Sequence, residues 1–205
     1  DIDQIFITHG HDDHFGLGRR IAEFSAAEVF VHGDDIFKVE ASPEDKETHR
    51  EPHKTFFQIA GVPKDISELM WDIRKSFEKF SEPLVLPNRL NDGETYRIGN
   101  RMMKIIHCPG HTPGVISLFD QESGLLFTGD HILKHISPNP CLEFKDGVRF
   151  KALVNYLESL KKIQNLPVTM LLPGHGDNVD KPHKIYRALE YHHNQRLERI
   201  VHLIT

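Results

Sequence analysis

The chain has 205 residues, of which 39% are hydrophobic, and a formal net charge of −5 at pH 7. This is enough apolar sequence for one globular core, but no apolar run reaches the roughly 18 residues of a membrane-spanning helix, and the negative charge provides no general basic field for nucleic acid. The two cysteines, Cys108 and Cys141, are too few for a disulfide framework, so we expect a cytoplasmic protein outside the membrane.

Short apolar segments bounded by turn residues alternate along the chain with segments of helical periodicity. Such apolar segments predict strands, and they cover residues 2–8, 27–32, 101–107, 114–119, 124–129 and 168–173. Apolar residues three or four positions apart predict helices that pack on these strands. The three sets are Leu17, Ile21 and Phe24, then Phe150, Leu153, Leu157 and Leu160, and finally Ile185, Leu189, Leu197, Ile200 and Ile204. The alternation predicts an α/β fold.

A helical insertion is expected at about residues 44–83. Asp65 and Glu68 have the spacing of a capping box, which predicts that a helix begins there. The apolar residues that follow at helical spacing are Ile66, Met70, Ile73, Phe77 and Phe80. The insertion is either a flap that selects substrate or an ordinary surface element, and Trp71 beside the apolar stripe faces the pocket, a partner chain or solvent.

Several predicted strands run directly into loops that carry histidine or aspartate. The segments are IFITHGHDDH, MKIIHCPGHTPG, LLFTGD and TMLLPGHG. Open α/β sheets usually bind ligands beyond the carboxyl ends of their strands. We therefore expect these side chains to meet at one edge of the sheet.

The first of these loops carries enough ligands for two metal ions. His9 and His11 are two positions apart in an extended segment, so both rings point to one side and can share one ion. If Asp13 and His14 bound the same ion, no position would remain open for water. These two residues are therefore assigned to a second ion nearby.

The later loops complete both sites. His111 can close the first site and His175 the second, while the carboxylate of Asp130 can bridge the two ions. Imidazole and carboxylate ligands suit zinc above all, with iron or manganese as alternatives. Two divalent ions, two carboxylates and a bridging hydroxide leave a net charge of about +1, which attracts carbonyl or phosphoryl oxygens and makes hydroxide available near neutral pH.

This ligand set resembles that of the metallo-β-lactamase superfamily. The matching residues are His9-x-His11-x-Asp13-His14, followed by His111, Asp130 and His175. The resemblance implies an αββα sandwich with two metal ions roughly 3.5–4 Å apart at one edge. It also implies a metal-bound hydroxide as nucleophile, with Asp13 orienting it as the catalytic residue.

The aspartate at position 130 indicates which branch of the superfamily the chain resembles. True zinc β-lactamases resemble one another in having cysteine at that position, whereas Asp130 looks like glyoxalase II and its bacterial hydrolase relatives. We therefore expect hydrolysis of an ester, a thioester or a related small acyl substrate. A phosphodiesterase or endoribonuclease with the same metals is the alternative, although no Lys/Arg-rich run is present to follow phosphates. A diiron redox protein is a second alternative.

Three residues outside the ligand set are candidates for contacting substrate. They are His131, which follows Asp130, together with His135 and Asn139 in the next loop. Cys108 lies close to His111, but the proposed site is already full, so Cys108 is expected to be structural.

Compared with the family pattern, the first ligand motif comes early in the chain. Superfamily members resemble one another in having several strands before that motif, yet here it begins at His9. We therefore expect an N-terminally incomplete sandwich and a longer natural protein that also continues past the last helix. An uncovered first sheet has an exposed edge, which favours pairing with another chain. Either upstream residues of the full protein cover this face, or a second copy does so in a homodimer, with residues 44–83 contributing to the contact.

Overall fold

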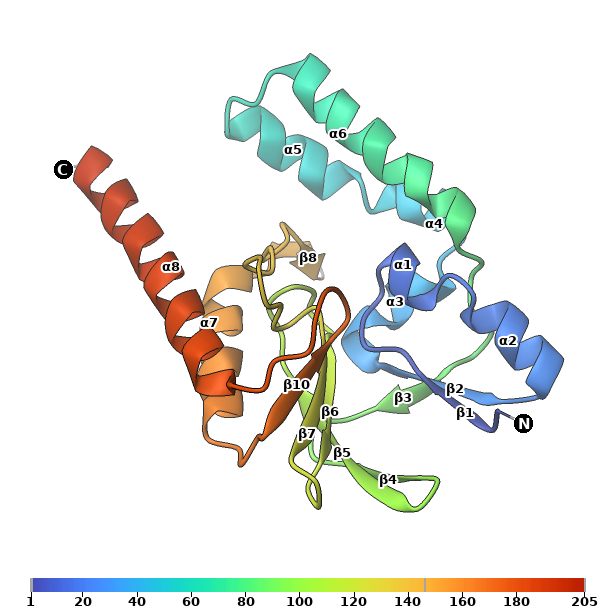
Figure 1. Cartoon of the computed structure of the whole chain (residues 1–205). Coiled ribbons are helices and arrows are strands. Elements are labelled where there is room, and N and C mark those ends of the chain that lie inside the picture. Colours follow the sequence, from blue (N-terminus) through green and yellow to red (C-terminus); the bar gives the residue numbers. More distant parts are fainter. Residues whose placement is uncertain (1, 146, 205) are drawn as a thin grey trace.

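Two β-sheets form the centre of the molecule in the computed structural model, which describes residues 2–145 and 147–204 (Figure 1). The strands are β1 Gln4–Phe6, β2 Glu28–His32, β3 Asn88–Leu90, β4 Thr95–Ile98, β5 Arg101–His107, β6 Ile116–Asp120, β7 Leu125–Gly129, β8 Phe144–Lys145, β9 Val148–Arg149 and β10 Met170–Pro173. The first sheet is parallel, with the order β1-β2-β3. The second has the order β10-β7-β6-β5-β4, in which β10 pairs with β7 in parallel and the other pairs are antiparallel. Strands β8 and β9 form a small hairpin.

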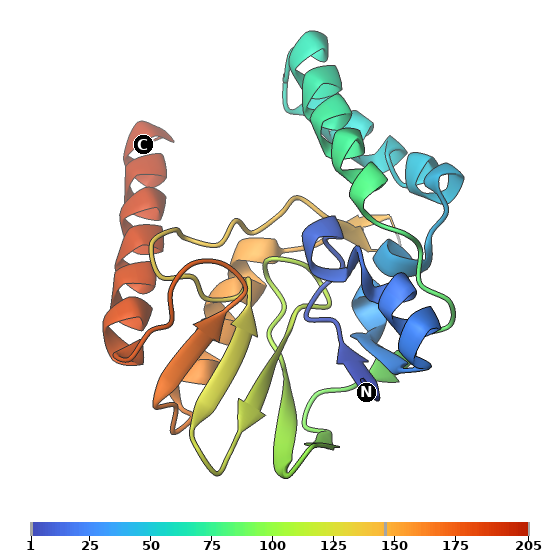
Figure 2. The same ribbon diagram turned by 45° about the vertical axis from the view of Figure 1, so that its right-hand side comes forward.

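Helices cover the outer face of each sheet (Figure 2). The first sheet is covered by α1 Asp12–Phe15, α2 Gly18–Ser25, η1 Gly33–Asp35 and α3 Ile36–Glu40, and the second by α7 Ala152–Gln164 and α8 Pro182–Ile204. Among the described residues, no helix combines the length and the hydropathy needed to cross a bilayer. The arrangement from one side to the other is helix, sheet, sheet, helix.

Three separate clusters of buried apolar side chains hold these four layers together. The cluster under α1 to α3 contains Ile7, Phe15, Val31, Val39 and Leu84. The cluster between the sheets contains Phe30, Leu90, Met103, Ile105, Ile116 and Leu118. The cluster under α7 and α8 includes Ile106, Phe119, Leu126, Leu160, Ile163, Leu171 and Leu189. One cluster lies under each of the two helical layers and one lies between the sheets, as in a stack of four layers. The expected α/β class and αββα sandwich are therefore confirmed.

Some predicted elements differ from the observed ones. The six predicted strands are present, β5 with the predicted bounds and the others with ends that differ by one or two residues, but the sequence pattern missed β3, β4, β8 and β9. In β3 only Leu90 is buried, and in β4 no residue is fully buried, so neither strand has a long apolar run to reveal it. The prediction that Leu17 and Phe24 pack on the strands is wrong, because both are exposed and Phe24 is 95% exposed. It is also wrong for the end of α8, where Leu197, Ile200 and Ile204 are exposed.

The predicted insertion forms a group of helices that we call the helical arm, residues 42–81. It consists of α4 Pro43–Thr48, α5 Glu51–Ile59, α6 Lys64–Phe77 and η2 Glu78–Phe80, and it projects from the sandwich above α1 (Figure 1). The capping box predicted at Asp65 and Glu68 is wrong, since α6 already begins at Lys64 after Pro63. A capping box does occur at the start of α4, where Ser42 and Asp45 cap each other's backbone N–H groups. Proline at the first position of α4 is compatible with that helix start.

The arm carries an apolar surface that the single chain leaves open. The predicted stripe on α6 and η2 is exposed at every position, from Ile66 at 45% to Phe80 at 62%. Strand β1 forms one edge of the first sheet in the described residues. The expected self-association through this surface stays a prediction.

Candidate metal centre

The seven predicted ligands lie on loops and helix starts at one end of both sheets. His9 and His11 follow β1, Asp13 and His14 lie on α1, and the other three follow β5, β7 and β10. The three are His111, Asp130 and His175. Because both sheets present strand ends here, residues 100 and 161 positions apart in sequence come into contact. The expectation of one shared edge is correct.

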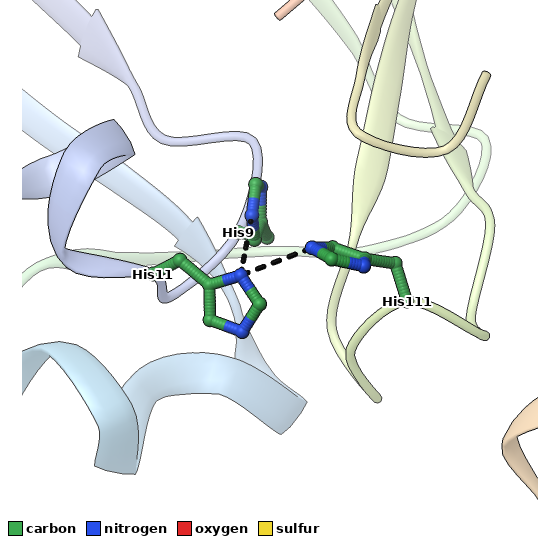
Figure 3. A group of neighbouring side chains, drawn as sticks. All are labelled: His9, His11 and His111. Carbon is green, nitrogen blue, oxygen red and sulfur yellow. Dashed lines mark hydrogen bonds between the residues drawn. The ribbon is translucent and has the colours of Figure 1, made fainter. Parts of the chain in front are cut away.

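One group of ring nitrogens consists of His9, His11 and His111 (Figure 3). The Nδ1 atom of His11 lies 3.1 Å from Nε2 of His9 and 3.0 Å from Nε2 of His111. The three rings point toward one another from two different loops. This is the trio that the sequence assigned to the first ion.

A second group consists of Asp13, His14 and His175. The Nε2 atoms of His14 and His175 are 3.1 Å apart, and Nε2 of His175 is 3.2 Å from a carboxylate oxygen of Asp13. Asp13 and His14 are neighbours on α1, whereas His175 reaches them from the loop after β10. This is the trio that the sequence assigned to the second ion.

Asp130 lies between the two groups. Its Oδ1 atom is 3.5 Å from Nε2 of His14, and its Oδ2 atom is 3.7 Å from Nε2 of His111 and 3.5 Å from Nε2 of His175. Burial opposes ionisation of Asp130, but its contact with His14 and the attraction of the other histidines lower its pKa on balance. The carboxylate is thus ionised and reaches both trios.

Burial keeps at least part of this histidine cluster neutral. Loss of water lowers the pKa of His9 well below its usual value, and the neighbouring histidines lower it further. The same burial lowers the pKa of His11 to about 2, with Lys38 contributing. A neutral imidazole has one N–H and one lone pair, so Nδ1 of His11 can donate to at most one of its two histidine neighbours at about 3 Å. Three ring nitrogens that converge in this way match the arrangement of imidazole ligands around one metal ion.

Two further observations fit a bound metal. Oδ1 of Asp130 is buried and has no hydrogen-bond partner, which is costly for a carboxylate unless a cation is there. Gly174 makes room for the cluster, since a Cβ at this position would lie 2.7 Å from Oδ1 of Asp130 and 2.8 Å from Cε1 of His14. The residues present therefore fit divalent ions bound through imidazole and carboxylate.

Contacts outside the cluster orient the rings. Nδ1 of His111 donates to the backbone carbonyl of Asn139 at 2.8 Å, which turns its Nε2 toward the site. The Thr8 hydroxyl lies 3.2 Å from Nδ1 of His9 and leaves the Nε2 atom of that ring facing His11. Partners of this kind fix the tautomer and ring orientation of metal-binding histidines.

Asp35 joins the two loops that carry the first trio, and the sequence analysis missed it. Its buried carboxylate accepts from the backbone N–H of Gly10 at 2.8 Å, from the Thr112 hydroxyl at 2.6 Å and from the backbone N–H of Gly114 at 2.8 Å. Gly10 lies between His9 and His11, and Thr112 follows His111. Asp35 lies shortly after β2 in the segment VHGDD, so the pattern of acidic residues behind an apolar strand could have revealed it.

The predicted substrate contacts lie elsewhere. His131 is fully buried in the core with its ring centroid 5.2 Å from that of Tyr156, so the prediction that it contacts substrate does not fit its position. His135 is exposed and pairs with Asp177 at 3.7 Å, and Asn139 contributes its backbone to His111. Cys108 is fully buried, and burial raises the pKa of its thiol to about 12, as expected for a structural residue.

The buried position of His131 predicts a pH effect on stability. Burial lowers its pKa from 6.5 to about 3 in the folded chain, so between these values only the unfolded state takes up the proton. Stability then falls as pH decreases from 6.5, by about 1.4 kcal/mol per pH unit for this group, and is unaffected by it above 6.5. In chelated protein, His131→Phe should reduce the pH slope of the urea-unfolding free energy by about that amount.

The control for this experiment is His202→Phe, at an exposed position on α8. This variant should keep the wild-type slope. Equal slopes for His131→Phe and wild type between roughly pH 4 and 6 would contradict the assignment of a neutral, buried His131.

A cavity of about 790 Å³ opens beside the metal-ligand candidates. Its wall includes His11 and Asp13 from the site, Phe37 from α3, and side chains of the helical arm. Pockets that bind drug-sized ligands usually have volumes of about 300–1,000 Å³. The arrangement therefore places a ligand-sized space against one member of each trio, His11 and Asp13.

Comparison with known proteins agrees with the fold and with the candidate metal site. Residues 1–175 match the family model described as metallo-beta-lactamase superfamily. The chain is similar to a probable metallo-hydrolase, YqjP, of Bacillus subtilis, with 33% identity over 87% of this chain and 56% of that protein. It is also similar to the acyl-coenzyme A thioesterase MBLAC2 of Gallus gallus, with 26% identity over 88% of this chain and 58% of that protein.

A solved structure resembles the whole chain. It is the crystal structure of a metallo-beta-lactamase family protein, TTHA1429, from Thermus thermophilus, with a TM-score of 0.84 and 25% sequence identity. The match covers 99% of this chain and 64% of that one. The chain thus spans somewhat more than half the length of the relatives it matches.

Proposed function

The chain belongs to the metallo-β-lactamase superfamily, and from its site geometry we propose that it is a metal-dependent hydrolase of acyl esters or thioesters. The observation that carries the proposal is the convergence of seven imidazole and carboxylate side chains beside a ligand-sized cavity. The similarity to proteins named as a metallo-hydrolase and an acyl-coenzyme A thioesterase supports acyl substrates over other hydrolysable groups.

Two divalent ions, with zinc as our first choice, are proposed for the two trios. His9, His11 and His111 would hold one, Asp13, His14 and His175 the other, and Asp130 would contribute to both. When bound, such ions lower the pKa of water to near 7 and polarise the oxygen of a carbonyl group. Iron and manganese are compatible with the same ligands.

The protein's own residues then have distinct tasks. Asp13 has a side chain that is 60% exposed and lines the cavity, so it can accept a hydrogen bond from the attacking water and orient it. Asp130, with 11% of its side chain exposed, is held against the histidines and is less accessible to substrate. The acyl carbonyl would approach from the cavity side, where His11 and Asp13 lie.

An activity screen tests this proposal. The metal-loaded protein should hydrolyse a thioester, an open-chain ester or a lactone faster than a phosphodiester or a short RNA measured side by side. Hydrolysis of RNA or the phosphodiester without acyl hydrolysis would replace the proposal by the phosphodiesterase alternative. A coloured iron-loaded protein that consumes oxygen and hydrolyses none of these would support the redox alternative, since zinc is colourless.

A further inference from the structure

The cavity beside the metal-ligand candidates has walls from separate parts of the chain. Besides the α1 region, they come from α3, the helical arm and the β8–β9 hairpin. The arm is attached to the sandwich at this point, because Nε2 of His53 lies 3.0 Å from the carbonyl oxygen of Leu142 and Lys46 lies 3.8 Å from Asp12. The cavity is therefore a product of the arm and the sandwich together.

Aromatic side chains dominate the apolar part of the wall. They are Phe37 of α3, Trp71 and Phe77 of α6, and Phe144 of β8. Phe77 is 53% exposed and Phe37 is 38% exposed, although large apolar side chains are stabilised by burial. Aromatic surface that remains open inside a concave site marks a place where an apolar ligand is buried.

Three of the four lysine and arginine side chains in the cavity wall are paired with carboxylates of the same wall, and the fourth, Arg74, lies with Cζ 5.6 Å from the ring centroid of Trp71. Lys38 contacts Glu143 at 2.5 Å, Lys145 contacts Asp34 at 2.6 Å, and Lys46 contacts Asp12 at 3.8 Å. Cations that are neutralised by neighbouring carboxylates give little attraction for a polyanion. The wall is thus better suited to an apolar chain than to a row of phosphates.

The size of the cavity also bears on its ligand. An acetyl or another very short acyl group would leave most of about 790 Å³ unfilled, whereas ligand sites usually bury most of their ligand's surface. The same space reaches His11 and Asp13, where the reacting carbonyl is proposed to lie. A chain attached to that carbonyl would extend along the aromatic wall.

We propose that this cavity binds the apolar chain of a medium- or long-chain acyl substrate, and that Phe77 and Trp71 set the preferred chain length. The proposal rests on the acyl-hydrolase function above and names its substrate class. Hydrolysis follows the ordinary balance: water adds to the carbonyl, the bond to the thiol or alcohol breaks, and a fatty acid and the protonated thiol or alcohol leave.

A chain-length series is the first test. With acetyl, octanoyl and dodecanoyl thioesters of one thiol, the metal-loaded protein should show a kcat/KM at least about tenfold higher for the longer chains than for acetyl. Phe77→Ala should lower the ratio of dodecanoyl to acetyl kcat/KM by about tenfold, because it removes part of the wall. Phe80→Ala is the matched control, since Phe80 is 62% exposed and lies outside the cavity wall.

A variant that fills part of the cavity tests the same proposal independently. Gly33 lines the cavity, and a Cβ there would meet no atom within 4 Å. Gly33→Leu therefore adds volume without a clash on the backbone and should lower kcat/KM for dodecanoyl by about tenfold relative to acetyl.

Tryptophan fluorescence gives a readout that does not depend on catalysis. Trp71 is the only tryptophan of the 205 residues and lies in the cavity wall. Dodecanoate should shift its emission to shorter wavelength with saturation, and acetate should not. Phe77→Ala should weaken the dodecanoate titration, while Phe80→Ala should leave it as in the wild type.

The outcomes separate this inference from the proposed function. The inference would be overturned by equal kcat/KM for all chain lengths, or by no effect of Phe77→Ala on the ratio of dodecanoyl to acetyl kcat/KM. A higher kcat/KM for a compact phenylacetyl thioester, added to the series, would also overturn it. Each of these results would leave acyl hydrolysis in place. Saturable dodecanoate binding without hydrolysis of any acyl substrate would support the apolar-chain site and overturn the proposed function.

Discussion

Replacing Asp13 by alanine is expected to reduce kcat on an acyl substrate by roughly 10²–10⁴-fold, the range for removal of a group that orients or deprotonates a nucleophile. The carboxylate lies 3.2 Å from Nε2 of His175 at the cavity wall, where the attacking water is proposed to be held. Its side chain is 60% exposed, so the free energy of unfolding should change by no more than about 0.5 kcal/mol. Steady-state kinetics of the metal-loaded protein measure the change in kcat. Urea unfolding of the chelated protein measures the change in stability separately.

Asp72→Ala is the control for this variant. Asp72 is an exposed carboxylate on α6 and lies outside the cavity wall. Its replacement should leave both kcat and stability close to the wild type. Wild-type turnover in Asp13→Ala, with metal content unchanged, would show that the proposed role of Asp13 is wrong.

Removing the metal ions is expected to lower the melting temperature by about 10 °C for each ion lost. An ion that binds only the folded chain stabilises it by about 4 kcal/mol when its free concentration is about 1,000 times the dissociation constant, and 1 kcal/mol corresponds to about 2–4 °C for a domain of this size. The convergence of the ring nitrogens of His9, His11 and His111 is the physical reason, because one cation can be coordinated by all three imidazoles at once. Calorimetry with and without zinc, together with metal analysis, measures the effect.

His11→Ala separates this effect from nonspecific metal binding. The His11 ring contacts both other members of the first trio, so its loss should remove one equivalent of metal and much of the thermal shift. The chelated variant should melt close to the chelated wild type, since no coordinated ion is lost. Identical melting temperatures of wild-type protein with and without bound metal would contradict a metal centre held by these residues.

The predicted ligands could be found from the sequence because their signal is local. His9, His11, Asp13 and His14 lie within six positions, and each later ligand follows an apolar strand. Parallel and antiparallel strands packed in two layers bring such strand ends to one edge, so the pattern predicted which side chains would meet. Asp35 also follows an apolar strand, β2, and binds a site loop. It was not recognised in the sequence because it belongs to none of the family motifs.

The fold was predictable to a similar extent and for a similar reason. Strand β6 is buried at every position and β5 and β7 at about half of theirs, so their apolar residues indicate these strands in the sequence. Strands β3 and β4 are short and mostly exposed, so cross-strand pairing rather than composition determines them. The start of α6 was also misjudged, because a spacing match at Asp65 and Glu68 does not require that the side chains cap the helix.

The α/β class, the four strand-end loops and the seven candidate ligands could be predicted from the amino-acid sequence, since each strand-end motif is a local pattern of an apolar run followed by histidine or aspartate. The burial of His131, the link that Asp35 forms between two site loops, and the aromatic cavity between the arm and the sandwich became visible in the folded chain alone. These features depend on contacts between segments distant in sequence, such as Phe37, Trp71 and Phe144. No local spacing encodes which of those segments will pack together, because many packings satisfy the same hydrophobic pattern.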